Sequence, residues 1–424
     1  MTAVVSSRWI RHLPARVLAK VGEPVRLSPL FNSKAYMELL RERLGGFAVE
    51  PDHRPHLVEA LRWLENAQDA TPDQGFARSY SMAWDPYFRR RGWQPSYPET
   101  TGYIIPTLLE AAHHLERPDL ADRAIRAAQW EIEVQLPSGA VQGGYIGQGR
   151  SPASFNTGQV IFGWLGAFEV TGDDRFAEAA RRAGRFLSSC LGSDGTWRSG
   201  YSPFASPHAT LFNAQAAWAL AEAGVRLGEP EFAALAGRSL RMVARRQAES
   251  GWFPECCLSD PTQPLLHTLA YAVRGLLEGG RVLADDDLIR SAERSAAALA
   301  ETVRTDGSMP GRYASDWSAT VGWSCLTGQA QMVNNWIRLS LIRGESKWLE
   351  PVPGVLKFLK ATQNRFHSDP GIRGGLKGSS PVSGAYARFQ ILSWATKYFA
   401  DALMRHEQVK TGEAEARLTE YSLA

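Results

Sequence analysis

Two residues capable of acid–base chemistry, Glu99 and His267, occupy equivalent positions in a repeat of the sequence. Steps of 56 residues back from His267 reach Leu211, Phe155 and then Glu99, and a step of 60 forward reaches Thr327. A carboxylate and an imidazole at the same level of one site could give and take a proton on one substrate. Each also has a structural interpretation, because an acidic or hydrogen-bonding side chain at a helix start stabilises the helix.

Other residues extend this acid–base set. Hydrolysis of a glycosidic bond uses one carboxyl group to protonate the leaving oxygen and a second as base or nucleophile. The sequence offers Asp316 as the partner of Glu99, with Asp85 as a further carboxylate. A lyase or a C5-epimerase instead removes the proton beside a uronate carboxylate that a cation has neutralised. The candidate groups for that chemistry are His267, His208, Tyr313 and Tyr145.

Aromatic and basic side chains are concentrated in loops that precede the expected inner helices. Rings stack on sugar faces and guanidinium groups bind carboxylates in pairs of hydrogen bonds, so this composition predicts a site for an anionic saccharide. The candidate substrate-binding residues are Tyr97, Tyr103, Tyr145, Arg150, Trp197, Tyr201, Arg312, Tyr313, Trp317, Arg373 and Lys377. We expect one cavity to be lined by Tyr97, Glu99, Tyr145, Arg150, His208, His267, Arg312, Asp316 and Arg373. The alternative is that the arginines pair with loop carboxylates and brace the loops.

A long repeat must position these residues. Leu120, Phe176, Phe232, Leu288 and Trp348 follow one another at steps of 56, 56, 56 and 60 residues. Self-similarity at such a period is the signature of a repeat architecture. Each unit holds two helices, one apolar on nearly all sides and therefore internal, and one apolar on a single side and therefore external.

The helix count predicts an all-α protein, a closed (α/α)6 toroid. Six inner helices are expected to begin near Thr101, Asn156, Leu211, Thr268, Gly328 and Ala385. Five outer helices follow near Asp119, Arg175, Glu231, Asp287 and Lys347, and a segment from His56 to Asn66 completes the ring. A closed ring buries the end faces that an open solenoid must cover. We place the barrel at 51–410, an N-terminal basic amphipathic extension at 1–50 and a tail at 411–424.

The N-terminal extension alternates basic and apolar residues. We interpret residues 8–21 as a segment strapped across the barrel, with peripheral attachment to an acidic membrane surface as the alternative. The chain has neither the apolar core of a secretory signal nor a run of about 18 apolar residues, so we expect a cytoplasmic protein. Its net charge of +3 is too small to favour nucleic-acid binding.

Metal binding is not expected, nor is any other cofactor. Cys256 and Cys257 are adjacent, and two adjacent cysteines rarely chelate one ion, so we interpret them as buried structural residues. The four cysteines of the chain do not form a spaced disulfide framework. The acidic run 285–287 is expected to begin an outer helix rather than to hold a metal.

Several short segments resemble a known family. They are Asn156-Thr-Gly-Gln159, Asp194-Gly-Thr-Trp197, His267-Thr-Leu-Ala-Tyr271, Trp323-Ser-Cys-Leu-Thr-Gly-Gln-Ala-Gln331 and Gly371-Ile-Arg-Gly-Gly375. Over roughly residues 75–405 the chain resembles bacterial (α/α)6-toroid proteins of polysaccharide-biosynthesis gene clusters. These proteins are described as six-hairpin glycosidase-like or terpene-cyclase-repeat-like, without an assigned reaction. The resemblance implies the toroid and a glycan context, whereas the acidic motif of a terpene cyclase cavity is missing.

Three functions therefore stay open at the level of the sequence. The first is a glycoside-hydrolase-like enzyme that acts on an acidic saccharide, with Glu99 and Asp316 as its carboxylates. The second is a uronate C5-epimerase or a polysaccharide lyase. The third is a non-catalytic glycan-binding or assembly protein. In each case the expected partner is an oligosaccharide or polysaccharide, and the first is our preferred interpretation.

Overall fold

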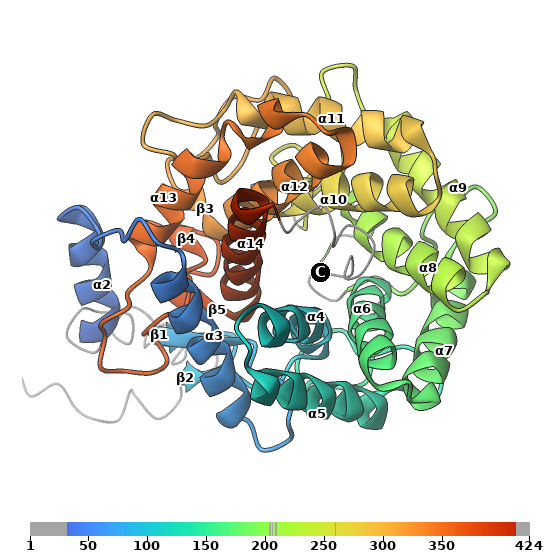
Figure 1. Ribbon diagram of the computed structural model, residues 1–424, viewed down its shortest axis with the longest axis horizontal. Helices are drawn as coiled ribbons and strands as arrows, with labels where there is room; N and C mark the ends of the chain where they lie inside the picture. Colours follow the sequence, from blue (N-terminus) through green and yellow to red (C-terminus); the bar gives the residue numbers. More distant parts are fainter. Residues whose placement is uncertain (1–31, 203–204, 206, 208–209, 259, 413–424) are drawn as a thin grey trace, which may run out of the picture.

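Two concentric rings of helices form the molecule. The computed structural model describes residues 32–202, 205, 207, 210–258 and 260–412. The inner helices are α4 (Pro98–His114), α6 (Ser154–Thr171), α8 (Ala214–Arg226), α10 (Leu266–Val282), α12 (Leu326–Arg343) and α14 (Ser393–Thr411). The outer helices are α3 (Arg54–Asp69), α5 (Pro118–Val134), α7 (Asp174–Cys190), α9 (Pro230–Arg246), α11 (Asp286–Ala300) and α13 (Val352–Thr362). The end-on view of Figure 1 shows the inner helices around a central axis, with the outer helices on the periphery.

Sequence pattern decides which ring a helix joins. In α6 the side chains from Ser154 to Ala167 are all buried, as expected for a helix that is apolar on every side. The neighbouring α7 buries only one face, and the Asp173 carboxylate accepts a hydrogen bond from the Arg175 amide at its start. Inner helices also approach closely at glycines. A Cβ atom on Gly102 of α4 would lie 2.5 Å from the Cα atom of Val160 in α6.

The ring closes between the two ends of the repeat region. The outer helix α3 packs on the last inner helix, α14, and α14 packs on the first inner helix, α4. The (α/α)6 toroid predicted from the repeat is therefore confirmed. Five inner helices begin within three residues of their expected positions, and a short 3-10 turn, Leu211–Asn213, leads into α8. A second 3-10 turn, Ser346–Leu349, precedes α13.

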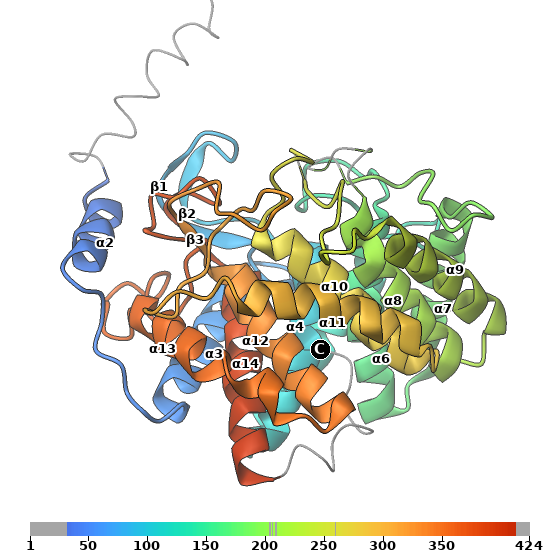
Figure 2. The same ribbon diagram turned by 90° about the horizontal axis from the view of Figure 1, so that it is seen from above.

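The sixth inner helix begins later than predicted, at Ser393 rather than near Ala385. The residues before it are occupied by two short strands, β4 (Ser379–Ser380) and β5 (Gln390–Leu392). Strand β4 pairs with β3 (Ser324–Cys325), while β5 joins β1 (Ser79–Asp85) and β2 (Arg90–Trp93) in the order β2-β1-β5. These strands were not predicted. Figure 2 shows β1, β2 and β3 gathered at one end of the helix ring.

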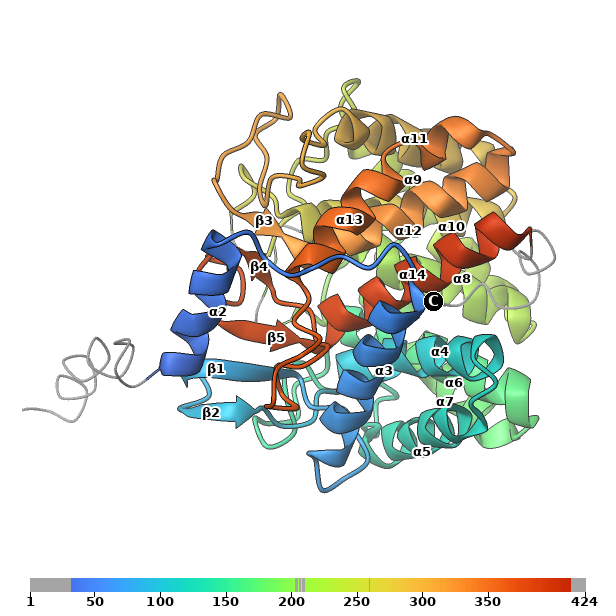
Figure 3. The same ribbon diagram turned by 60° about the vertical axis from the view of Figure 1, so that its left-hand side comes forward.

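Part of the N-terminal extension lies against the barrel. Helix α2 (Ser33–Arg43) lies beside the three-stranded sheet in Figure 3. The Glu38 carboxylate is fully buried, 3.1 Å from the ammonium of Lys377, and it accepts a hydrogen bond from Asn364. The amphipathic segment 8–21 and the tail beyond residue 412 lie outside the described residues. No helix in the described part of the chain has both the length and the apolarity needed to cross a membrane.

Candidate active site

A cavity of about 170 Å³ lies at the end of the barrel where the inner helices begin. The first turns of four inner-helix units contribute Glu99, Phe155, Phe212 and His267 to its wall. The sequence repeat aligned Glu99, Phe155, Leu211 and His267 at one level. In the structure the wall contains three of these residues, and Phe212 takes the place of its neighbour Leu211. Tyr386 and Gln390, which precede α14, and Trp394, in the first turn of α14, form another part of the wall.

Glu99 lies in the first turn of α4, directly after Tyr97 and Pro98. Burial raises the pKa of its carboxyl to about 7, although the Tyr97 hydroxyl and the Arg78 guanidinium both act in the opposite direction. At neutral pH the group is therefore present in both protonation states. A carboxyl with such a pKa can serve as a general acid or a general base near pH 7.

His267 lies in the first turn of α10 and is 7% exposed. Its Nδ1 atom lies 2.8 Å from the Oε1 atom of Gln331 on α12. Burial lowers the pKa of the imidazole to about 4, so the ring is neutral at neutral pH. The rings of Tyr271 and Tyr386 flank it, with centroids at 4.6 and 5.6 Å. These contacts hold a neutral imidazole at the cavity wall.

Arg78 is a third chemical group in the cavity. Its guanidinium lies 4.7 Å from the ring centroid of Trp394 and 5.9 Å from that of Tyr97. It donates a hydrogen bond to the Gln390 side-chain oxygen at 3.3 Å, and the Asp85 carboxylate accepts a hydrogen bond from the Gln390 amide. Among the described residues, the hydrogen-bond and ring partners of Arg78 are uncharged, and its charge also acts on the nearby Glu99 carboxyl, whose pKa it lowers. The guanidinium is therefore suited to bind a carboxylate of a ligand.

The sequence analysis found three of the residues that line this cavity, namely Tyr97, Glu99 and His267. Tyr103 lies deeper in the barrel, beneath the cavity, with its ring 5.8 Å from that of Tyr398. His208 lies outside the described residues.

The second expected carboxylate does not share the cavity. Asp316 is exposed and accepts a hydrogen bond from the Ser318 amide within its own turn. The prediction that Glu99 and Asp316 line one cavity is therefore wrong. Residues before and after Asp316 face other partners, because the Tyr313 hydroxyl is hydrogen-bonded to Thr302 and the Trp317 indole donates to the Ser250 carbonyl oxygen.

Three basic residues expected in the cavity brace the structure instead. Arg373 forms two 2.7 Å hydrogen bonds with Glu59 of the outer helix α3. The Lys377 ammonium is 1% exposed and lies between the carboxylates of Glu38 and Glu42. Arg312 donates to the Gln263 carbonyl oxygen at 2.5 Å. The alternative that these side chains stabilise loops agrees with the structure.

The remaining candidates lie around the same end of the barrel but do not line the cavity. Tyr145 packs on Phe88, with ring centroids 5.1 Å apart, and Arg150 is exposed. The Trp197 side chain is buried, and the Tyr201 hydroxyl donates to its carbonyl oxygen at 2.8 Å. In the described structure these residues shape the loops.

Sequence reasoning missed several residues of the cavity. Trp394 carried a usable signal, because apolar residues at 394, 395, 398, 399, 402 and 403 follow a helical period that begins after Ser393. Locating that helix start would have placed an aromatic residue at the level of Glu99. Arg78 carried no such signal, since it lies outside the repeat units and is positioned by strand pairing.

The described residues contain no group of three or more His, Cys, Asp or Glu side chains arranged to hold a metal ion. Cys256 and Cys257 are buried, and the Cys256 thiol donates to the Thr268 carbonyl oxygen. Asp285 lies at the start of α11, where it pairs with Arg241, and Asp286 pairs with Arg290 and Arg343. The acidic run is therefore a helix start with external ion pairs.

No family model and no curated protein matches this sequence. Solved structures match its fold. An unsaturated glucuronyl hydrolase specific for heparin has a TM-score of 0.66 at 16% identity, covering 86% of this chain and 99% of that one. The unsaturated glucuronyl hydrolase of Bacillus sp. GL1, responsible for glycosaminoglycan degradation, has a TM-score of 0.65 at 13% identity, covering 85% and 98%. Cellobiose 2-epimerase from Bacillus thermoamylovorans has a TM-score of 0.63 at 10% identity, covering 84% and 98%. This likeness establishes a six-hairpin glycosidase-like fold.

Proposed function

We propose that this protein is a carbohydrate-active enzyme that transfers a proton on an acidic saccharide, as a uronate epimerase or a lyase does. The observation that carries the proposal is the presence of Glu99, His267 and Arg78 in one cavity. A carboxyl with a pKa of about 7, a neutral imidazole and a guanidinium provide an acid, a base and a carboxylate-binding group. A role in polysaccharide biosynthesis or processing is part of the same proposal.

The chemistry follows from the charge on each group. Arg78 binds the uronate carboxylate, which makes the hydrogen on the adjacent carbon more acidic by stabilising the charge that develops when it leaves. The Nε2 atom of His267 takes this proton. Glu99, in its protonated form, returns a proton to the opposite face of the carbon in an epimerase, or to the leaving oxygen in a lyase.

The geometry favours this reaction over the two-carboxylate hydrolysis that the sequence suggested. A glycosidase of that type needs a second carboxyl group within about 5–10 Å of the first, across the scissile bond. Among the described residues that line the cavity, Glu99 is the only carboxylic acid. His267 lines the same cavity and its Nδ1 atom contacts Gln331, which supports Nε2 as the base for proton abstraction.

Product analysis in D2O tests the proposal. The purified protein is incubated with oligosaccharides that contain glucuronate or galacturonate, and products are examined by NMR and mass spectrometry. An epimerase incorporates deuterium beside the carboxylate, and a lyase produces an unsaturated uronate with ultraviolet absorbance. Hydrolysis would yield new reducing ends with neither change and would contradict the proposal. Binding without turnover across this panel would favour the glycan-binding alternative.

A further inference from the structure

Helix α2 exposes apolar side chains along one side. Met37 and Leu40 are each 47% exposed, and Leu44, which directly follows the helix, is 78% exposed. Spacings of three and four residues place all three side chains on the same side of a helix. Among the described residues, no other helix exposes more than one large apolar side chain. We call Met37, Leu40 and Leu44 the outer face of α2.

The opposite side of α2 carries two glutamates and packs on the protein. Glu38 is fully buried, and its carboxylate lies 3.1 Å from the Lys377 ammonium. The Glu42 carboxylate lies 3.3 Å from the same ammonium and accepts a hydrogen bond from the Val382 amide at 2.6 Å. These contacts hold α2 with its acidic side inward and its apolar side outward. Figures 1 and 2 both show α2 at the edge of the molecule.

Basic side chains flank the outer face on both sides. At about 3.6 residues per turn, Lys34 and Arg41 lie along one edge of the outer face and Arg43 lies along the other. Lys34 pairs with Asp369, and its side chain is 55% exposed. Arg41 pairs with Glu38 at 2.8 Å, and its side chain is 41% exposed. Arg43 is exposed. An apolar strip between cationic edges is the pattern of a helix that lies on an anionic membrane surface.

The sequence that precedes α2 is also basic. Residues 1–31 lie outside the described part of the chain, and their composition includes a single acidic residue, Glu23. Their basic residues are Arg8, Arg11, Arg16, Lys20 and Arg26. Because this segment joins the described structure at Asn32, its positive charge is tethered beside the outer face of α2. A polybasic segment next to an apolar strip supplies the second signal that stable attachment to a membrane surface needs.

Charge disfavours two other ways to cover the outer face. Residues 8–21 of the same chain contain apolar side chains, but they include four basic residues and no acidic one. Packing them on the outer face would bring their cations against those of α2, and like charges in contact are costly. A second copy of the chain would bring Lys34, Arg41 and Arg43 against the same three residues across a twofold axis. Anionic phospholipids instead offer complementary charge next to an apolar layer.

We propose that the outer face of α2 docks on the surface of a membrane that contains anionic phospholipids. Its three apolar side chains enter the boundary between headgroups and acyl chains, while the flanking cations stay at the level of the lipid phosphates. Each cation held near such a surface strengthens binding by about fivefold. The apolar strip is short, so the binding is reversible and weakens as salt screens the charges. This docking does not depend on the proposed reaction, because it can be measured without any substrate.

Sedimentation with lipid vesicles tests the proposal. The full chain is mixed with vesicles of phosphatidylcholine alone, or with vesicles of phosphatidylcholine and anionic phosphatidylglycerol in equal parts. We expect the protein to sediment with the mixed vesicles at low salt, to stay in solution with the neutral vesicles, and to leave the mixed vesicles as the salt concentration rises. Failure to bind the mixed vesicles at low salt overturns the proposal, and so does equal binding to both kinds of vesicle.

A fluorescent label on the outer face locates the contact. The four cysteines of the chain are buried, so Leu44→Cys offers one accessible thiol for an environment-sensitive fluorophore such as nitrobenzoxadiazole. The emission of this label should shift to shorter wavelength when mixed vesicles are added. Val225→Cys, at another exposed apolar position, is the matched control and should show no shift. A protein that sediments without a shift at Leu44→Cys binds through another part of the chain, which would refute the role of α2.

Serine variants measure what the apolar strip contributes. Leu40→Ser combined with Leu44→Ser should weaken vesicle binding by about tenfold or more, because two side chains no longer gain from leaving water. Val170→Ser combined with Val225→Ser removes two exposed apolar side chains elsewhere and should leave binding unchanged. If residues 8–21 cover the outer face, the leucine variant will melt at a lower temperature. If a second copy covers it, the variant will lose a dimer in light scattering. Either result with unchanged vesicle binding overturns the proposal.

Discussion

The Nδ1 atom of His267 lies 2.8 Å from the Oε1 atom of Gln331, on the adjacent inner helix. Because an amide oxygen accepts hydrogen bonds, this contact places the imidazole proton on Nδ1 and leaves the lone pair on Nε2. A hydrogen bond to one ring nitrogen commonly sets the role of the other in this way. Gln331 is thus a positioning residue for the proposed base.

Replacing Gln331 tests this relationship. Gln331→Leu should lower kcat by about 10–100-fold, because the imidazole loses the partner that fixes its orientation and tautomer. The acidic limb of the pH–rate profile should also move to lower pH, since the hydrogen bond to Gln331 raises the pKa of His267. Gln331→Glu, which keeps an acceptor oxygen, should recover part of the rate. A purely structural role would change stability and leave the pH profile in place.

Glu99→Gln should reduce turnover of an acidic saccharide by about 10²–10⁴-fold with little change in KM. The glutamine has nearly the same shape but cannot donate or accept the reacting proton. Initial rates with the substrate found in the D2O experiment measure the effect. Glu249→Gln, at an exposed position, is the matched control and should retain full activity.

The effect of Glu99→Gln on the melting temperature distinguishes a buried catalytic carboxyl from a residue that mainly stabilises the helix start. The Glu99 carboxyl has a raised pKa, so the folded protein holds this proton more tightly than the unfolded chain. Ionisation therefore weakens folding as pH rises from about 4.5 to about 7, by on the order of 1–3 kcal/mol. Glu99→Gln removes this penalty and should raise the melting temperature at pH 8 but not near pH 4. A variant that melts lower at pH 8 would indicate a residue that mainly stabilises the start of α4.

The pH dependence of kcat/KM should have two limbs. His267 must be neutral to accept a proton, so activity should rise as pH increases through about 4. Glu99 must be protonated to donate one, so activity should fall as pH increases through about 7. Rates measured in overlapping buffers at fixed ionic strength give the profile. Activity that instead rises through pH 7 would assign Glu99 as the base and reverse the two roles.

Arg78→Lys should raise KM for an acidic saccharide at least tenfold and change kcat less. Lysine keeps the charge but loses the planar donor group that binds a carboxylate and stacks on Trp394. The neutral, carboxyl-reduced form of the same saccharide is the matched comparison, and its KM should be unaffected. Equal losses for both substrates would show that Arg78 shapes the cavity without binding a carboxylate.

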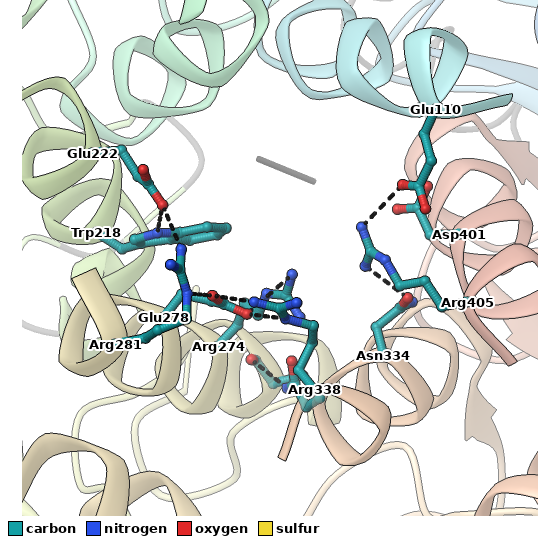
Figure 4. Close-up of polar contacts among 12 residues, drawn as sticks. Glu110, Trp218, Glu222, Arg274, Glu278, Arg281, Asn334, Arg338, Asp401 and Arg405 are labelled. Carbon is teal, nitrogen blue, oxygen red and sulfur yellow. Dashed lines mark hydrogen bonds and ion pairs between the residues drawn. The ribbon is translucent and has the colours of Figure 1, made fainter. Parts of the chain in front are cut away.

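Glu278→Gln should destabilise the protein by about 3–5 kcal/mol in urea unfolding, because a buried carboxylate that balances three arginines is lost. Glu178→Gln is the control, since the ion pair of Glu178 with Arg185 is exposed and should matter little. A small effect at Glu278 would mean that water reaches these three arginines, drawn with Glu278 in Figure 4, and replaces the carboxylate.

The fold could be predicted from the repeat period, because the repeated apolar residues are those that pack one helix against the next. Positions such as Phe176 and Leu288 bury the same helix face in successive units, and their spacing is visible without any knowledge of the ring. The strands β1, β2 and β5 left no such pattern. Each is short, and their pairing joins residues near position 80 to residues near 391. Local sequence does not encode a contact of that kind.

The candidate site was only partly predictable for the same reason. Glu99 and His267 were found because they belong to the repeat, and the toroid brings repeat positions to one level. Arg373 and Lys377 are of the right chemical type and occur in the loop segments, but their partners on α3 and α2 lie more than 300 positions away in the sequence. Residue type alone could not separate a substrate-binding cation from one neutralised by a distant carboxylate.

The pairing of α3 with α14 has a consequence for synthesis on the ribosome. Helix α3 is made before any other helix of the ring and α14 after all of them, yet each covers the other. The apolar side of α3, with Leu57, Leu61 and Leu64 all 1% exposed or less in the finished protein, stays without its partner until translation has passed Thr411. Until then, nascent chains expose this apolar surface of α3. Chaperones would bind to this surface, and premature association between chains would begin there.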